Sequence, residues 1–165
     1  MTFASDPSEP GTARRVIVLT TDGSADSLAA VGPTAELAKK LNARVLLLTV
    51  VCDAPLPESA NASLPFSTNA WNRDVEAEVA TARQALHRVA EGMREHLAAE
   101  DVEEVVLRGE CPDAVIASVA AVRDAEFIAM ASHGRTGLRR LLIGSVTEQV
   151  IRRSNIPVIV FPVAA

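Results

Sequence analysis

The clearest indication of the fold is the stretch AEFIAMASHGRTGLRRLLIGSVTEQVIRRSNIPVIVFP, residues 125–162. It begins with an apolar run of strand length, passes through a loop with three glycines, continues with helical spacing and ends in a second apolar run. Two buried strands joined by a helix form the connection typical of a parallel sheet, in which such helices cover the faces.

The rest of the chain repeats this alternation. Residues 52–72 carry three prolines without periodicity, which predicts a long loop. Pro33 removes a backbone donor and is expected to kink the first helix. The strand at 102–109 is less apolar than the others, which is typical of a sheet edge. The pattern predicts a Rossmann-like α/β fold: an open five-stranded parallel sheet with helices on both faces. The other expected strands lie at 16–19 and 43–51, and the other expected helices at 25–41, 73–97 and 111–122.

Length and composition fit a single domain, residues 14–165, that follows a loose tail at 1–13. The net charge of −5 and a pI near 5.2 argue against nucleic acid or anionic membranes as partners. The chain shows no secretory signal and no apolar run of membrane-spanning length, so we expect a cytoplasmic protein. Cys52 and Cys111 form no metal or disulfide pattern and are expected to be ordinary residues in a reducing compartment.

Two loops with unusual residues follow strands of this sheet. The tripeptide DGS, residues 22–24, follows the first strand, and SHG, residues 132–134, follows the fourth. Ligands of open α/β sheets bind at the carboxyl ends of the strands, where the strand order reverses. We therefore expect the two loops to meet at one site.

The loop before the last helix has the features of a phosphate site. Ser145 and Glu148 fit an S-x-x-E capping box, which predicts that this helix begins at Val146. The N–H groups of a helix N-terminus behind a glycine loop attract anions. Gly134 and Gly144 would let the backbone close around phosphates, and the Ser145 hydroxyl would be a further donor.

Four polar side chains invite a functional interpretation. Asp22 would repel phosphate, so it is expected to accept from a ribose hydroxyl or an adenine amino group, to hold a phosphate-bound metal, or to cap its own turn. His133 shows no triad partner and is expected to support its loop. His87 and His96 lack metal-ligand spacing and are expected on the solvated surface.

The run MASHGRTGLRRLLIGSVTEQVIRRSNIPVIVFP closely resembles the C-terminal signature of the universal stress proteins, and VIVLTTDGSADS resembles their first strand and loop. The resemblance extends from about Arg15 to Val163. ATP-binding members carry G-x-x-G, a spacer and then G-S or G-T. In this chain the frame reads Ala131, Gly134, the nine residues 135–143, and Gly144 followed by serine. An alanine in place of the first glycine still offers its N–H where φ is negative.

This resemblance implies an adenine nucleotide alpha hydrolase-like fold with an ATP site. It places Asp22 and the Val50 backbone at the nucleoside. It places the glycine frame and Val146 at the phosphates. Thr20 stands where relatives often have proline, and Arg135 could reach the phosphates or a neighbouring subunit. The candidate nucleotide-binding residues are Thr20, Asp22, Val50, Met130, Ala131, Gly134, Arg135, Gly144, Ser145, Val146 and Thr147.

The family also dimerises by pairing its last strands across a twofold axis. The resemblance therefore implies a homodimer through the strand that begins at Ile156 and ends at Phe161. Pro157 and Pro162 are compatible with this position, because proline is tolerated on a sheet edge.

Different classes of function fit these features. The first is a nucleotide-responsive regulator of the stress response that binds ATP, with or without Mg²⁺, or another adenine nucleotide such as cyclic AMP. Such a protein would hydrolyse ATP slowly at most, because the sequence shows no evident general base. The second is an adenylating ATP-pyrophosphatase, since DGSADS partly resembles the S-G-G-x-D-S loop. A nucleotide-free dimeric scaffold is a third. A Walker loop is excluded, because G-x-x-x-x-G-K-[ST] does not occur.

Overall fold

The computed structural model describes residues 14–52, 68–132 and 144–163, with side chains from Val75 onward in the second range. Its centre is a parallel sheet of five strands in the order β3-β2-β1-β4-β5. The predicted α/β fold is confirmed, and β3 lies at a sheet edge as its composition predicts. The strands are β1 (Val16–Thr20), β2 (Arg44–Cys52), β3 (Val102–Gly109), β4 (Phe127–Ala131) and β5 (Val158–Phe161).

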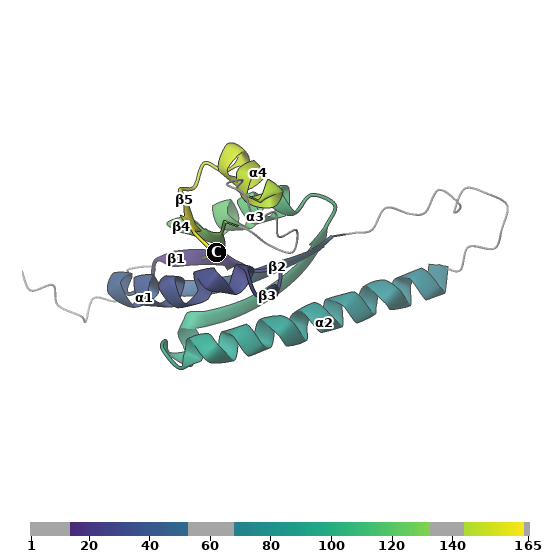
Figure 1. Cartoon of the computed structure of the whole chain (residues 1–165), viewed down its shortest axis with the longest axis horizontal. Helices are drawn as coiled ribbons and strands as arrows, with labels where there is room; N and C mark the ends of the chain where they lie inside the picture. Colours follow the sequence, from purple (N-terminus) through teal and green to yellow (C-terminus); the bar gives the residue numbers. More distant parts are fainter. Residues whose placement is uncertain (1–13, 53–67, 133–143, 164–165) are drawn as a thin grey trace, which may run out of the picture.

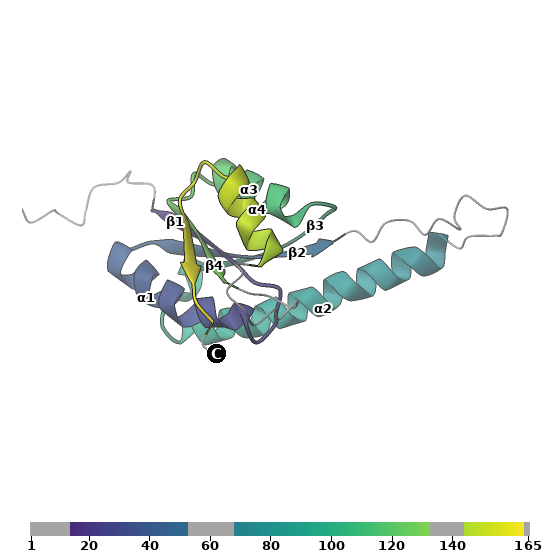
Figure 2. The same cartoon turned by 45° about the horizontal axis from the view of Figure 1, so that its top comes forward.

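Helices cover both faces of the sheet (Figures 1 and 2). One face carries α1 (Val31–Leu41) and α2 (Thr68–Arg94), and the other carries α3 (Pro112–Val122) and α4 (Ser145–Arg153). The described ranges also contain the short 3-10 helices η1 (Ser27–Ala30) and η3 (Ala99–Asp101). Figure 1 shows that the N-terminal part of α2 runs well past the end of the sheet.

Alternation along the central strands divides the core in two. Ile17 and Leu19 of β1 pack in the apolar cluster that includes residues of α1 and α2. Val18, between them, packs in the cluster that includes residues of α3 and α4. Because successive side chains of a strand point to opposite faces, these continuous apolar runs produce strands that are buried on both sides.

Three predicted boundaries are wrong for physical reasons. The chain forms η1 before α1, so α1 begins at Val31 and Pro33 lies in its first turn, where a missing N–H breaks no hydrogen bond within α1. The segment 68–72, predicted as loop, is already helical. The last strand begins at Val158 instead of Ile156, although the Pro157 carbonyl still accepts from the N–H of Ile128 at 2.9 Å.

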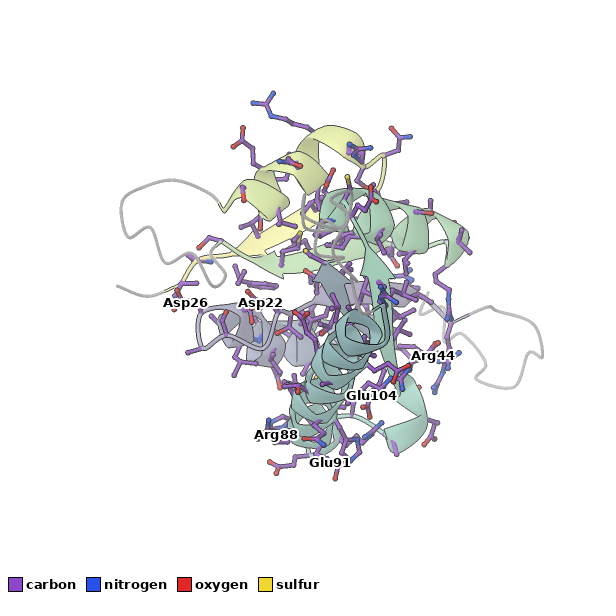
Figure 3. All side chains as sticks on the ribbon, turned by 90° about the vertical axis from the view of Figure 1, so that its right-hand side faces the viewer. Asp22, Asp26, Arg44, Arg88, Glu91 and Glu104 are labelled. Carbon is purple, nitrogen blue, oxygen red and sulfur yellow. The ribbon has the colours of Figure 1, made fainter. Side chains whose placement is uncertain are left out.

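A cluster of charged side chains fastens α2 to β3 (Figure 3). Glu104 of β3 lies 3.1 Å from His87 Nδ1 and 2.9 Å from the Arg94 guanidinium. The hydrogen bond with Glu91, assisted by Glu104, raises the pKa of Arg94 above its ordinary value. His87 is exposed, as predicted, but it also has a carboxylate partner.

Candidate functional site

A cavity of about 530 Å³ lies at the carboxyl ends of the strands. The chain places β2 and β3 on one side of β1, and β4 and β5 on the other, so the strand order reverses between β1 and β4. The cavity is therefore at the point where open α/β sheets bind their ligands. Residues from the ends of β1, β2 and β4 and from helices α2, α3 and α4 line it.

The turn after β1 forms one wall and is held by its own hydrogen bonds. Thr21 continues the sheet by donating its N–H to the Leu48 carbonyl at 3.0 Å. The buried hydroxyls of Thr21 and Ser27 lie 2.8 Å apart, and the Gly23 N–H donates to Thr21 Oγ1 at 3.1 Å. Gly23 has a φ of +76°, a conformation that favours glycine. The wall is thus shaped before any ligand arrives.

Asp22 of this turn lines the cavity and also organises the backbone. Its Oδ1 accepts hydrogen bonds from the Ser24 N–H at 3.0 Å and from the Ser24 hydroxyl at 2.6 Å. The turn-capping role among the predicted alternatives is therefore present. Figure 3 shows Asp22 and Asp26 to the left of α2 and Glu104 to its right. A role toward a ligand is compatible with this geometry, because a carboxylate can accept several hydrogen bonds.

The N-terminus of α4 forms the opposite wall. The helix begins at Ser145 with Gly144 as its N-cap, so the predicted capping box and the start at Val146 are wrong. Because the capping residue is one position earlier than expected, it is a glycine and supplies no side-chain cap. The Glu148 carboxylate instead lies 2.9 Å from Arg152. A helix N-terminus without a side-chain cap directs N–H groups outward, which suits an anion.

The end of β4 joins these two walls. Ala131 occupies the position of the first motif glycine without backbone strain, because the non-glycine residues with positive φ in the described ranges are Asn42 and Asp124. Its side chain belongs to the apolar cluster that contains Leu19. Its carbonyl accepts a hydrogen bond from Thr147 Oγ1 at 3.2 Å. The alanine is therefore accommodated by the core and ties β4 to α4.

The profile of the universal stress protein family matches residues 13–162, nearly the whole chain. The chain belongs to this family. Among its relatives, universal stress protein MJ0531 of Methanocaldococcus jannaschii is 33% identical over 144 residues, which cover 87% of this chain and 79% of the relative. Universal stress protein MJ0577 of the same organism is 32% identical over 122 residues, which cover 70% of this chain and 75% of the relative.

Solved structures share the fold of this family member. The structure of MJ0577 superposes with a TM-score of 0.76 at 24% identity, over 92% of this chain and 97% of that one. A universal stress protein solved in complex with cAMP has a TM-score of 0.57 at 22% identity, over 93% and 100% of the two chains. One from Archaeoglobus fulgidus, solved in complex with dAMP, has a TM-score of 0.50 at 20% identity, over 90% and 97%.

The cavity brings most of the predicted site residues together. Those that line it are Thr20, Asp22, Val50, Met130, Ala131, Gly144, Ser145, Val146 and Thr147. Gly134 and Arg135, together with His133, lie outside the described residues. Sequence reasoning missed the wall that α2 contributes, which includes Glu78, Thr81 and Ala85. The apolar stripe of α2 predicts a helix on a sheet, but it contains no signal that part of this helix covers a ligand site.

The described ranges of this family member lack two further features. No group of three or more His, Cys, Asp or Glu side chains there could hold a metal ion. No helix in the same ranges is long and apolar enough to cross a membrane.

Proposed function

We propose that this universal stress protein binds an adenine nucleotide, with ATP as the first candidate, and acts as a nucleotide-responsive regulator in the cytoplasm. One observation carries the proposal: the glycine-capped start of α4 and the turn after β1 face the same cavity at the strand-order reversal. That position and that helix end are the two features that bind nucleotides in open α/β sheets.

The two walls suit the two halves of a nucleotide. The N–H groups at the start of α4, from Ser145 and Val146, would bind phosphate, and Gly134 and Arg135 would complete that side. Asp22 and the backbone of Val50 would bind the nucleoside, because a carboxylate accepts from hydroxyl and amino groups but repels phosphate. A volume of about 530 Å³ lies within the range of cavities that hold small organic ligands.

The nucleotide complexes of the structural neighbours support this assignment. Their ligands, cAMP and dAMP, share an adenine base and a single phosphate. A site that is common to the fold would therefore recognise adenine and one phosphate first. Further phosphates and Mg²⁺ would lie beyond that point, toward the start of α4.

The lining supports a binding protein more than an enzyme. Among the described residues the ionisable side chains that line the cavity are those of Asp22, Cys52 and Glu78. Asp22 already accepts two hydrogen bonds from Ser24, and Glu78 is exposed on α2. A general base needs a position within reach of the attacking water. We therefore expect ATP hydrolysis to be slow or absent.

The first experiment identifies the ligand. The protein is purified without added nucleotide and denatured, and released small molecules are identified by mass spectrometry. Calorimetric titrations with ATP, cAMP and dAMP, with and without Mg²⁺, then rank the ligands. The products formed from ATP are also identified. Slow formation of ADP agrees with the nucleotide-responsive regulator, whereas AMP and pyrophosphate would indicate an adenylating enzyme. No binding of any adenine nucleotide would overturn the proposal and favour a scaffold.

We also propose that the protein forms a homodimer through β5. This strand lies at a sheet edge, and its four apolar residues are all only half-buried. An exposed edge strand can pair with a second copy. Ile159→Asp should convert the dimer to monomer or aggregate, as measured by light scattering with circular dichroism as the folding check. Leu107→Asp, on the opposite edge strand β3, is the matched control. A dimer that persists in Ile159→Asp would contradict the pairing.

A further inference from the structure

The fold gathers both cysteines of the chain at one end of the sheet. Cys52 is the last residue of β2 and stands opposite Gly109, the last residue of β3. Cys111 follows two residues later as the N-cap of α3. Both cysteines are exposed and have free thiols. These are the two cysteines of the whole sequence, and β2 and β3 are adjacent in the sheet.

Cys52 occupies the face of the sheet on which α3 lies. Leu46 and Leu48 of β2 belong to the apolar cluster that contains Ile116 of α3. Side chains at every second position of a strand share a face, so Cys52 has the same orientation as Leu48. The cavity lining agrees, since it includes Cys52 together with Pro112 and Ile116 of α3.

The turn from β3 into α3 places Cys111 two residues after Gly109, the register partner of Cys52. A Cβ atom at Gly109 would lie 2.6 Å from Val115 Cγ2, so the absence of a side chain lets α3 fold back closely against the strand end. The Cys111 carbonyl accepts hydrogen bonds from the N–H groups of Ala114 and Val115, each at 3.1 Å. A disulfide needs Cα atoms about 4.4 to 6.8 Å apart. Neighbouring strands are spaced by about 4.8 Å, so a bridge requires that the chain after Gly109 turn toward β2. The helix that follows does pack over β2, because Ile116 of α3 shares an apolar cluster with Leu46 and Leu48.

We propose that Cys52 and Cys111 form an oxidisable thiol pair at the rim of the cavity. A small disulfide such as glutathione disulfide is the class of oxidant. One protein thiolate attacks it and forms a mixed disulfide with release of one glutathione. The second protein thiolate then displaces the other glutathione. Two thiols are thereby oxidised to one intramolecular disulfide, and one glutathione disulfide is reduced to two glutathione molecules.

The bridge would couple oxidation to the cavity. Cys52 and Pro112 both line it, so a disulfide from Cys52 to Cys111 would tie the end of β2 to the start of α3 across its rim. An altered rim changes ligand affinity, and coupling between two such sites is typically fivefold or more. This consequence rests on the proposed nucleotide binding, whereas formation of the disulfide does not.

The test measures the thiols of the reduced, purified protein in glutathione buffers of graded ratio. Samples are quenched with acid, alkylated and weighed intact by mass spectrometry. On oxidation the wild type should lose the mass of two hydrogens and take up no alkylating reagent. Its intact mass should remain that of a single chain, without a covalent link to a second copy. Cys52→Ser and Cys111→Ser should each carry one glutathione instead. A wild type that carries two glutathiones, or two alkylated thiols in buffers that glutathionylate the single variants, would overturn the pair.

A second measurement separates this proposal from the nucleotide site. ATP affinity of the oxidised and reduced wild type should differ by at least about fivefold. The double variant Cys52→Ser/Cys111→Ser should bind equally in both buffers. A disulfide without a change in affinity would overturn the coupling to the cavity. If neither form binds any adenine nucleotide, the proposed function fails, and the mass measurement still decides the thiol pair.

Discussion

The two walls of the cavity are built in opposite ways. The turn after β1 uses the hydroxyls of Thr21 and Ser27 and the carboxylate of Asp22 to satisfy its own backbone and side chains. The start of α4 has Gly144 as its N-cap and receives no hydrogen bond from a capping side chain. The turn after β1 satisfies its own hydrogen-bonding groups, whereas the start of α4 presents backbone N–H donors to the cavity.

A ligand is expected to stabilise the two walls to different extents. A wall that is held by internal hydrogen bonds is pre-organised, so a bound ligand adds little to its stability. An uncapped helix N-terminus has donors that an anion can satisfy. Substitutions in the α4 wall should therefore change nucleotide affinity. Those in the turn after β1 should mainly change the free energy of unfolding, except at Asp22, which we propose also binds the nucleoside.

The largest effect is expected for Gly144→Val. Gly144 has φ −56° and ψ 147°, a conformation that valine adopts without strain, so the fold should remain. The added side chain stands at the helix end that phosphate must approach. We expect ATP affinity to fall at least about 100-fold, equal to about 2.7 kcal/mol, as measured by calorimetry. Gly92→Val on the exposed side of α2, where a Cβ meets nothing within 4 Å, is the control. Unchanged affinity in Gly144→Val would refute the site.

The next effect concerns stability. Thr21→Val keeps the side-chain shape but removes a buried hydroxyl, which leaves the Gly23 N–H without this acceptor and Ser27 without one partner. A lost partner of a buried polar group costs about 1–3 kcal/mol, so we expect a decrease of about 2 kcal/mol in the free energy of unfolding. Urea titration measures it. Thr81→Val, which removes an exposed hydroxyl of α2, should change stability by less than about 0.5 kcal/mol. Equal effects would show that the turn is not self-supported.

The same contrast explains what the sequence could predict. Apolar periodicity predicts the five parallel strands and the helices on both faces, because burial on both sides requires continuous apolar runs. The glycine frame and DGS predict that Asp22 and Gly144 line one cavity, because the carboxyl ends of parallel strands share one edge of the sheet. The residue that caps α4 could not be predicted, since Ser145 and Gly144 are both acceptable N-caps and their choice depends on the backbone path into the helix. The wall from α2 depends on how far this helix extends past the sheet, which periodicity does not encode.

Asp22→Asn separates the two roles of Asp22. Asparagine also caps turns of this kind, so the bonds to Ser24 should persist and stability should change by less than about 0.5 kcal/mol. The negative charge and one acceptor are lost. If Asp22 accepts from the nucleoside, ATP affinity should fall about tenfold, equal to about 1.4 kcal/mol. Titration calorimetry and thermal unfolding measure the two effects. An unchanged affinity would assign Asp22 to the turn alone.

The smallest effect is expected for Gly23→Ala. The φ of +76° disfavours alanine by about 1 kcal/mol. The new methyl group would meet the Cβ of Ala85 at 3.5 Å, an ordinary contact, so the conformation alone determines the effect. Gly32→Ala near the start of α1, where a Cβ meets nothing within 4 Å, should be neutral or slightly stabilising and is the control. Because Gly23 belongs to the self-supported wall, its substitution should lower the unfolding midpoint in urea while ATP affinity stays within about twofold. A larger loss of affinity than of stability would mean that the ligand helps to shape this wall, and that the two walls differ less than their hydrogen bonds indicate.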